Sequence, residues 1–351
     1  MAHYGDFNRQ PADHVYLSGY GFVSGRDPLH FVERDLRRIA AAAGIALLLL
    51  LTFPFLLRRP MEIFASMLMA LCSALFGTSG LTAAVEPVRE IKEILLYLLS
   101  VSVVLLLMRA MLQPPVQQTA PSSSANRSVL CSLMLSAGIG ALSVCAIQVQ
   151  QGILQFCHLV ELTPGSPIPT RPAAVFLYLL RIILLPAVFE ELLFRGCLLQ
   201  ALRRQGDSFA LFFSALCSGL IQYTFTNDLN GFVLGLLFGY VYLRTGSLRT
   251  AMGCHLFTSA LPVFLEGLQH LISGEQYTAV SAALLMMLLA IGLAGFTLFC
   301  RWNHNAFILS DKQGQALPFR RKLQICLTST PMLAAALLWL VQIVRNMQVI
   351  S

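Results

Sequence analysis

The stretch Phe189-Glu190-Glu191-Leu192-Leu193-Phe194-Arg195-Gly196 places two adjacent acids and an arginine inside a long apolar helix pattern. A bare charge in hydrocarbon costs a few kcal/mol or more, so such residues face a protein interior or a cavity and pair with one another. The stretch therefore predicts a functional site inside a membrane-embedded helix. The alternative interpretation is that the three charges form a neutralised clamp between helices.

Composition places this helix in a membrane protein. Hydrophobic residues make up 56% of the 351-residue chain and charged residues 12%, against roughly a quarter charged in soluble domains. Because one span takes about 20 residues, the apolar runs predict an all-α, polytopic integral membrane protein with about 8–10 transmembrane helices. The nine cysteines include no CxxC pair, so they indicate neither a disulfide framework nor a zinc site.

The order of polar and apolar segments predicts four parts of the chain. They are a polar N-terminal tail at 1–37, N-terminal transmembrane helices with a Pro/Ser-rich linker at 38–127, a membrane core at 128–300, and a basic loop with a C-terminal helix at 301–351. Candidate spans lie at 39–57, 61–85, 91–112, 128–156, 173–202, 209–225, 231–243, 251–268, 279–300 and 327–344. The run at 61–85 contains two glycines and could be broken or re-entrant.

The net charge of +7 comes from Lys and Arg clusters at the ends of apolar runs, which indicates membrane topology rather than nucleic-acid binding. Cytoplasmic placement of Arg203-Arg204 and of the loop at 301–322 favours ten spans with both termini outside. The cluster Arg34, Arg37 and Arg38 argues against that arrangement. If the run at 61–85 does not cross the membrane, the N-terminus lies inside instead.

The two acids of the charged helix have different expected roles. Glu191 and Arg195 are four residues apart with the acid first, which is the favourable spacing for an ion pair within a helix. Glu190 points about 100° away around the helix, toward another helix. Glu191 is therefore the acid held by Arg195, and Glu190 is available as a general base.

Later apolar runs supply polar partners for such a base. His255 lies in Gly253-Cys254-His255-Leu256-Phe257, and Ser259 follows one turn later on the same helix face. Gln222 lies about 20 Å into its predicted helix from the Arg203-Arg204 loop, a depth similar to that of Glu190. Taken singly, each has a structural alternative: a hydrogen-bonded histidine, a packing serine and an interhelical amide contact. Gly231, Gly235 and Gly239 predict a face that packs closely on a neighbouring helix.

Together these residues resemble the CAAX protease and bacteriocin-processing (CPBP, or Abi) family of intramembrane proteases. The resemblance covers about residues 173–268. It consists of Glu190-Glu191-x-x-x-Arg195, then Thr245-Gly246-Ser247-Leu248 shortly before the helix that carries His255.

The resemblance implies that Glu190 activates water, that Glu191 and Arg195 hold the site together, and that His255 and its partner one turn later stabilise the oxyanion. Two positions depart from the family pattern, because Gln222 stands where the family has His and Ser259 stands where it has Asn or Asp. Glutamine cannot take up a proton or match imidazole as a metal ligand. With two strong ligands left, no cofactor is expected and a bound divalent metal is disfavoured.

The sequence therefore predicts an intramembrane endopeptidase that hydrolyses a hydrophobic or lipidated peptide or protein in the lipid bilayer, with no nucleic-acid partner. The expected location is a bacterial cytoplasmic membrane. Two alternatives stay open: a catalytically silent family member acting as a membrane scaffold or bacteriocin-immunity protein, and a proton-coupled transporter. The transporter is the weaker of the two, because the sequence shows no inverted repeat or paired broken helices.

Overall fold

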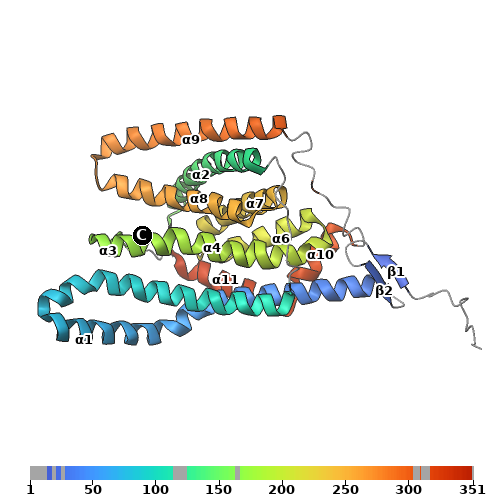
Figure 1. The fold of residues 1–351 in the computed structure, drawn as a ribbon, viewed down its shortest axis with the longest axis horizontal. Helices are drawn as coiled ribbons and strands as arrows, with labels where there is room; N and C mark the ends of the chain where they lie inside the picture. The colour runs from blue at the N-terminus through green and yellow to red at the C-terminus, as the bar shows by residue number, and fades with distance from the viewer. Residues whose placement is uncertain are drawn as a thin grey trace, which may run out of the picture.

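The computed structural model describes residues 14–17, 21–24, 28–113, 125–162, 167–302, 309 and 317–349, which are almost entirely helical. The helices lie side by side as a bundle (Figure 1). Two short antiparallel pairs join β1 (His14–Leu17) to β2 (Gly21–Ser24) and β3 (Leu159–Glu161) to β4 (Met347–Val349). The prediction of an all-α polytopic fold is confirmed. Most of the predicted N-terminal tail, the Pro/Ser-rich linker and much of the basic loop lie outside the described residues.

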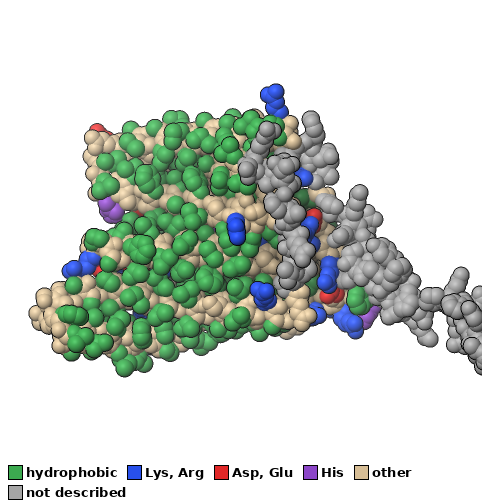
Figure 2. Space-filling model, viewed as in Figure 1, with side chains coloured by type: hydrophobic (Ala, Val, Ile, Leu, Met, Phe, Trp, Pro, Cys, Tyr) green, Lys and Arg blue, Asp and Glu red, His purple; other side chains and the backbone are tan. Residues whose placement is uncertain are grey.

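Apolar helices make up most of the bundle. Five described helices are long and apolar enough to cross a membrane, or up to six if one pair bent by 72° counts as a single span. The outer elements are α1 (Pro28–Leu112), α2 (Ala125–Phe156), α8 (Leu248–Gln269), α9 (Gly274–Trp302), and the bent pair α10 (Phe319–Leu327) and α11 (Thr330–Asn346). Figure 2 shows hydrophobic side chains over most of the face drawn, with most Lys and Arg side chains toward its right-hand end.

Helix α1 contains three of the predicted spans and doubles back on itself (Figure 1). The helical conformation is interrupted at Gly77, which has φ 67° and ψ −161°, a conformation that a residue with a Cβ rarely adopts. Because of this turn, both ends of α1 lie at the same end of the bundle, and Arg38 Nη2 donates to Met111 O at 2.5 Å. The predicted run at 61–85 is therefore broken in its middle and is not a separate crossing.

The two ends of the described chain lie at opposite ends of the bundle. Strand β4 pairs with β3, beyond the far end of α2, whereas α1 begins at the other end (Figure 1). This differs from the predicted arrangement with both termini on one side. It agrees with the alternative in which the run at 61–85 does not cross the membrane and the N-terminus lies inside.

The charged stretch lies in a nearly straight helical segment, Pro172–Gln205, which agrees with the predicted helix. The segment comprises α3 (Pro172–Leu179), η1 (Leu180–Leu184), α4 (Leu185–Glu191), η2 (Leu192–Leu199), α5 (Gln200–Leu202) and η3 (Arg203–Gln205), with η1 and η2 in π-helical conformation. Pro186 lacks the N–H that a regular α-helical turn needs at this point. The wider turns flank the two acids on both sides, as π-helical turns frequently do at functional sites.

Helices α6 (Asp207–Gly219) and α7 (Phe225–Thr245) complete the inner part of the bundle. The largest buried apolar cluster joins α1, η2, α6 and α7. The predicted spans 209–225 and 231–243 therefore have different boundaries, because α6 ends earlier and α7 begins earlier. A turn, Leu220–Thr224, separates them.

The contact between α2 and α9 depends on two facing glycines. A Cβ on Gly138 would lie 2.6 Å from Gly292 Cα, and a Cβ on Gly292 would overlap Gly138 Cα. We expect Gly292→Ala to destabilise the folded protein by about 1–3 kcal/mol, the usual effect of overpacking. Gly267→Ala is the control, because a Cβ at that position meets nothing within 4 Å. Thermal unfolding in mild detergent measures both, and equal melting temperatures would contradict the expected close contact.

Candidate active site

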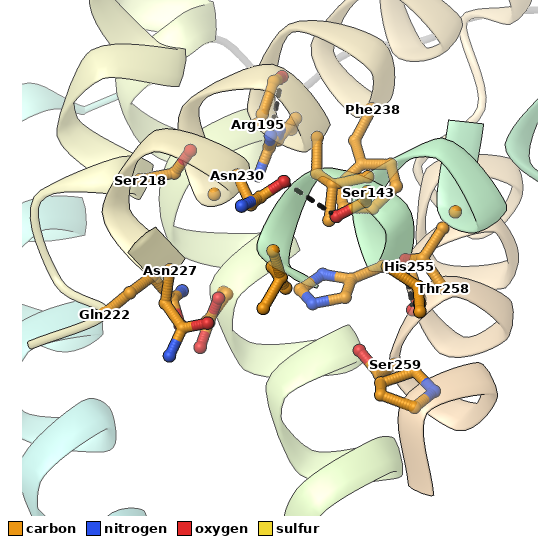
Figure 3. A pocket seen from close by; sticks show the side chains of 18 residues that line it. Ser143, Arg195, Ser218, Gln222, Asn227, Asn230, Phe238, His255, Thr258 and Ser259 are labelled. Carbon is orange, nitrogen blue, oxygen red and sulfur yellow. Dashed lines mark hydrogen bonds between the residues drawn. The ribbon is translucent and has the colours of Figure 1, made fainter. Parts of the chain in front are cut away.

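A cavity of about 190 Å³ lies among α2, α4, η2, α7, α8 and the turn before α7. Four of the predicted site residues line it: Glu190, Gln222, His255 and Ser259. Arg195 also reaches the cavity, whereas Glu191 is completely buried behind it. Figure 3 shows the labelled side chains arranged around this space. The fold thus brings together residues that are up to 69 positions apart in the sequence, from 190 to 259.

Glu191 is the centre of a buried ionic cluster. Arg195 Nη1 donates to Glu191 Oε1 at 2.9 Å, and His255 Nδ1 lies 2.9 Å from the same oxygen. Arg195 Nη2 donates to the backbone oxygen of Gly235 at 2.8 Å. Removing one partner from such a buried pair leaves an uncompensated charge, so the cluster ties η2, α7 and α8 to one another.

The contact between His255 and Glu191 was not predicted, because the sequence analysis grouped His255 with Ser259. The carboxylate fixes the orientation of the imidazole ring, as carboxylate partners of histidine commonly do. The ring also stacks on Phe238, with centroids 4.8 Å apart and an angle of 17° between the planes. With Nδ1 directed to Glu191, Nε2 is the ring nitrogen available to a bound molecule. The side chain is 13% exposed.

Glu190 lies next to this cluster but is not part of it. Within the described part of the chain, its carboxylate has no hydrogen-bond or ion-pair partner, and it lines the cavity. The two acids therefore occupy different environments, one held by Arg195 and His255 and the other facing open space. This is the division that the helix geometry predicted, although its chemical consequence stays a prediction.

Gln222 lies in the turn Leu220–Thr224, so its predicted position inside a helix is wrong. Its backbone N–H lies 3.2 Å from Gly219 O and 3.1 Å from Asp228 Oδ1. Helix α7 restarts because Thr224 acts as its N-cap and accepts from the backbone N–H of Asn227. The apolar run continues through this turn, which explains why the hydropathy pattern did not reveal it.

Close packing at glycines holds Gln222 against α7. A Cβ on Gly231 would lie 3.0 Å from Gln222 Cγ, and a Cβ on Gly235 would lie 3.0 Å from Ala215 Cα. The glycine face therefore packs on a neighbour, as predicted. Gly231 and Gly235 also line the cavity, which the sequence analysis did not expect.

Five polar residues of the cavity wall were not recognised as site residues: Ser143, Ser218, Asn227, Asn230 and Thr258. Ser143 donates to Asn230 Oδ1 at 3.1 Å, and Asn230 Nδ2 lies 3.2 Å from Gln150 Oε1 (Figure 3 shows the first of these bonds). The two asparagines lie three apart on α7, so their common helix face was a usable signal. Ser143 comes from α2, and nothing local in its sequence distinguishes it.

The donor set of the cavity is relevant to metal binding. In the described ranges, no group of three or more His, Cys, Asp or Glu side chains could hold a metal ion. The cavity offers Glu190, His255 and neutral amides, a weak set beside the three or four ligands of typical zinc sites. The expectation that no metal takes part stays a prediction.

These features define a class: a polytopic membrane protein with a Glu–Arg–His cluster and a second, unpaired carboxylate at an intramembrane cavity. Residues 172–261 match the family model described as Type II CAAX prenyl endopeptidase Rce1-like. This match confirms, over residues 172–261, the resemblance to the CAAX protease family noted in the sequence. The matched segment contains every predicted site residue. No curated protein and no solved structure matches the chain.

Proposed function

We propose that this protein is an intramembrane endopeptidase that hydrolyses a peptide bond with water activated by Glu190. The observation that carries the proposal is that two side chains line the same cavity: the Glu190 carboxylate, which has no partner among the described residues, and the His255 imidazole, which Glu191 orients. A general base needs a bound water within hydrogen-bond reach, and the developing oxyanion needs a donor nearby. The cavity provides candidates for both roles.

In the proposed reaction, the Glu190 carboxylate takes a proton from water while the water oxygen attacks the scissile carbonyl carbon. His255, protonated on both nitrogens, donates from Nδ1 to Glu191 and from Nε2 to the oxyanion. Ser259 is a second donor candidate. Collapse of the tetrahedral intermediate breaks the C–N bond, and Glu190 returns its proton to the leaving amine. Water is consumed, and the catalytic groups recover their starting charges.

The charges of this mechanism balance when Glu190 is counted together with the buried cluster beside it. The carboxylates of Glu190 and Glu191 carry two negative charges, and Arg195 with a protonated His255 carries two positive charges. A neutral cluster avoids the high cost of an isolated ion in a medium of low dielectric constant.

The proposed substrate is a hydrophobic or lipidated peptide or protein that reaches the site from the lipid bilayer. The apolar outer face of the bundle supports this choice, as do the helices around the cavity that are long and apolar enough to span a membrane. The lining offers no cation beyond Arg195 and His255, so it does not favour a strongly acidic substrate. The proposed location is a bacterial cytoplasmic membrane.

Gln222 provides a direct test of the proposed chemistry. We expect the purified protein in lipid nanodiscs to hydrolyse fluorogenic hydrophobic or lipidated peptides, and Gln222→His to raise kcat. An added imidazole can share proton transfer, an effect worth about 10²- to 10⁴-fold at most. Gln276→His, an exposed position on α9, is the control and should leave kcat unchanged.

Each outcome of this comparison has a clear meaning. Hydrolysis by the wild type supports the proposal. Activity in Gln222→His alone would show that the natural protein is a pseudoenzyme built on the same site. If neither protein hydrolyses any peptide of the panel, including lipidated ones, the proposed function is wrong.

A further inference from the structure

The turn that carries Gln222 adopts a backbone conformation that needs support from its surroundings. Tyr223 has a φ of 66°, and a non-glycine residue in this left-handed region costs about 1–3 kcal/mol. Such conformations persist when neighbouring structure holds them in place. The contacts of the turn therefore indicate what determines the position of Gln222.

One carboxylate connects this turn to the C-terminal helix. Asp228 Oδ1 accepts from the backbone N–H of Gln222 at 3.1 Å, and Asp228 Oδ2 accepts from Trp339 Nε1 at 2.5 Å. Asp228 is 7% exposed, so little water competes for either oxygen. Each carboxyl oxygen of Asp228 therefore accepts one of these two hydrogen bonds. The chain of contacts runs from α11 through α7 to the turn.

Further bonds attach the same turn to two distant segments. Asn346 Nδ2, at the end of α11, donates to Tyr223 O at 2.8 Å. Tyr223 OH donates to Leu50 O of α1 at 3.0 Å. Neither α1 nor α11 belongs to the segment at 172–261 that matches the family model.

We propose that Asp228 and Trp339 are positioning residues that fix Gln222 at the cavity, so that α11 is a functional part of the site. This inference rests on the proposed function for its catalytic consequence. Gln222 supplies a neutral amide where an ionisable side chain would otherwise stand, and an amide acts only through the geometry of its hydrogen bonds. A side chain misplaced by about 1 Å can cost about a hundredfold in rate. The network from α11 provides this geometry.

Trp339→Phe tests the inference, because it removes the N–H donor and keeps an aromatic ring. Gln342→Met is the matched control on the same helix. Gln342 Nε2 donates to Leu51 O at 3.0 Å, and the side chain is 5% exposed, but it does not contact the turn. Both substitutions delete one hydrogen bond of α11, so a general weakening of this helix should affect the two proteins alike.

We expect amide hydrogen exchange at residues 220–224 to be at least about tenfold faster in Trp339→Phe than in Gln342→Met. With hydrophobic peptide as substrate, kcat should fall by about ten- to a hundredfold in Trp339→Phe alone, with KM and melting temperature close to those of the control. Asp228→Asn should reproduce both effects, because its Oδ1 can serve only one of the two donors. A purely structural role would lower the melting temperature without this selective loss of kcat.

The two proposals fail in different ways. If residues 220–224 exchange equally fast in Trp339→Phe and Gln342→Met, or if the wild type hydrolyses peptide and kcat is equal in the two variants, the positioning role is wrong. If exchange differs as expected but the wild type and Gln222→His are both inactive, the proposed function is wrong. In that case the positioning of Gln222 by α11 remains valid, and its role is to shape the cavity for binding.

Discussion

Glu190→Gln should lower kcat by about 10²- to 10⁴-fold, the usual contribution of a general base. The substitution keeps the size and hydrogen-bonding capacity of the side chain but removes the group that accepts the proton from water. Because the Glu190 carboxylate has no hydrogen-bond or ion-pair partner among the described residues, the substitution breaks no such contact. The melting temperature should therefore stay close to that of the wild type.

Glu266→Gln is the matched control, since Glu266 is an exposed acid on α8 that does not line the cavity. Steady-state hydrolysis of a hydrophobic peptide in nanodiscs measures both variants. Retained activity in Glu190→Gln would remove Glu190 as the base. A cellular phenotype that survives this substitution would instead favour the catalytically silent alternative.

Arg195→Met should destabilise the folded protein by about 3–5 kcal/mol, as expected when one partner of a buried ion pair is removed. Arg195 is 1% exposed and neutralises a carboxylate that is completely buried. The substitution also removes the bond to Gly235 O, so η2 loses its polar contact with α7. Loss of this arginine leaves Glu191 with His255 as its remaining partner.

Arg203→Met is an informative control, because it breaks another ion pair of i,i+4 spacing, between the end of the same helical segment and the first residue of α6. Arg203 Nε lies 2.9 Å from Asp207 Oδ1, and the arginine side chain is 35% exposed. Such a solvated pair contributes about 0–1 kcal/mol. Equilibrium unfolding in mixed micelles compares the two variants, and equal losses would contradict the buried-cluster interpretation.

The double variant Glu191→Leu/Arg195→Met separates stability from function. Replacing both partners by apolar side chains removes the uncompensated charge, so part of the lost stability should return. Hydrolysis should be absent in the double variant, because His255 then lacks the Glu191 carboxylate that orients its ring. Recovery of full activity would show that Glu191 has no orienting role.

Local sequence was sufficient for the part of the site that lies on one helix. The spacing of Glu191 and Arg195 determines their ion pair, and the neighbouring position of Glu190 determines that it faces elsewhere. The bond between His255 and Glu191 depends instead on how α8 packs against α4 and η2. No periodicity within either segment specifies that contact.

Two errors have a common physical cause. Hydropathy reports whether residues are apolar, but it does not report where the backbone changes direction. Leu220 and Ile221, at the start of the turn, continue the apolar pattern of α6, and α1 reverses at Gly77 inside an apolar run. In α1, the glycine in the sequence indicated that the helix could break there. In the other turn, the left-handed residue is Tyr223, which the sequence did not indicate.

The ion pair between Glu191 and Arg195 has a consequence for biogenesis, because both partners belong to one segment. Synthesis runs from the N-terminus, so Pro172–Gln205 precedes α7 and α8 on the way to the membrane. An acid whose counter-ion belonged to a later helix would lie in the lipid without an ion-pair partner until that helix inserted. Here the two charges can neutralise each other at the moment of insertion, and His255 joins them only when α8 docks. The order of the residues along the chain thus lets two of the three charges at 190–195 neutralise each other within one segment.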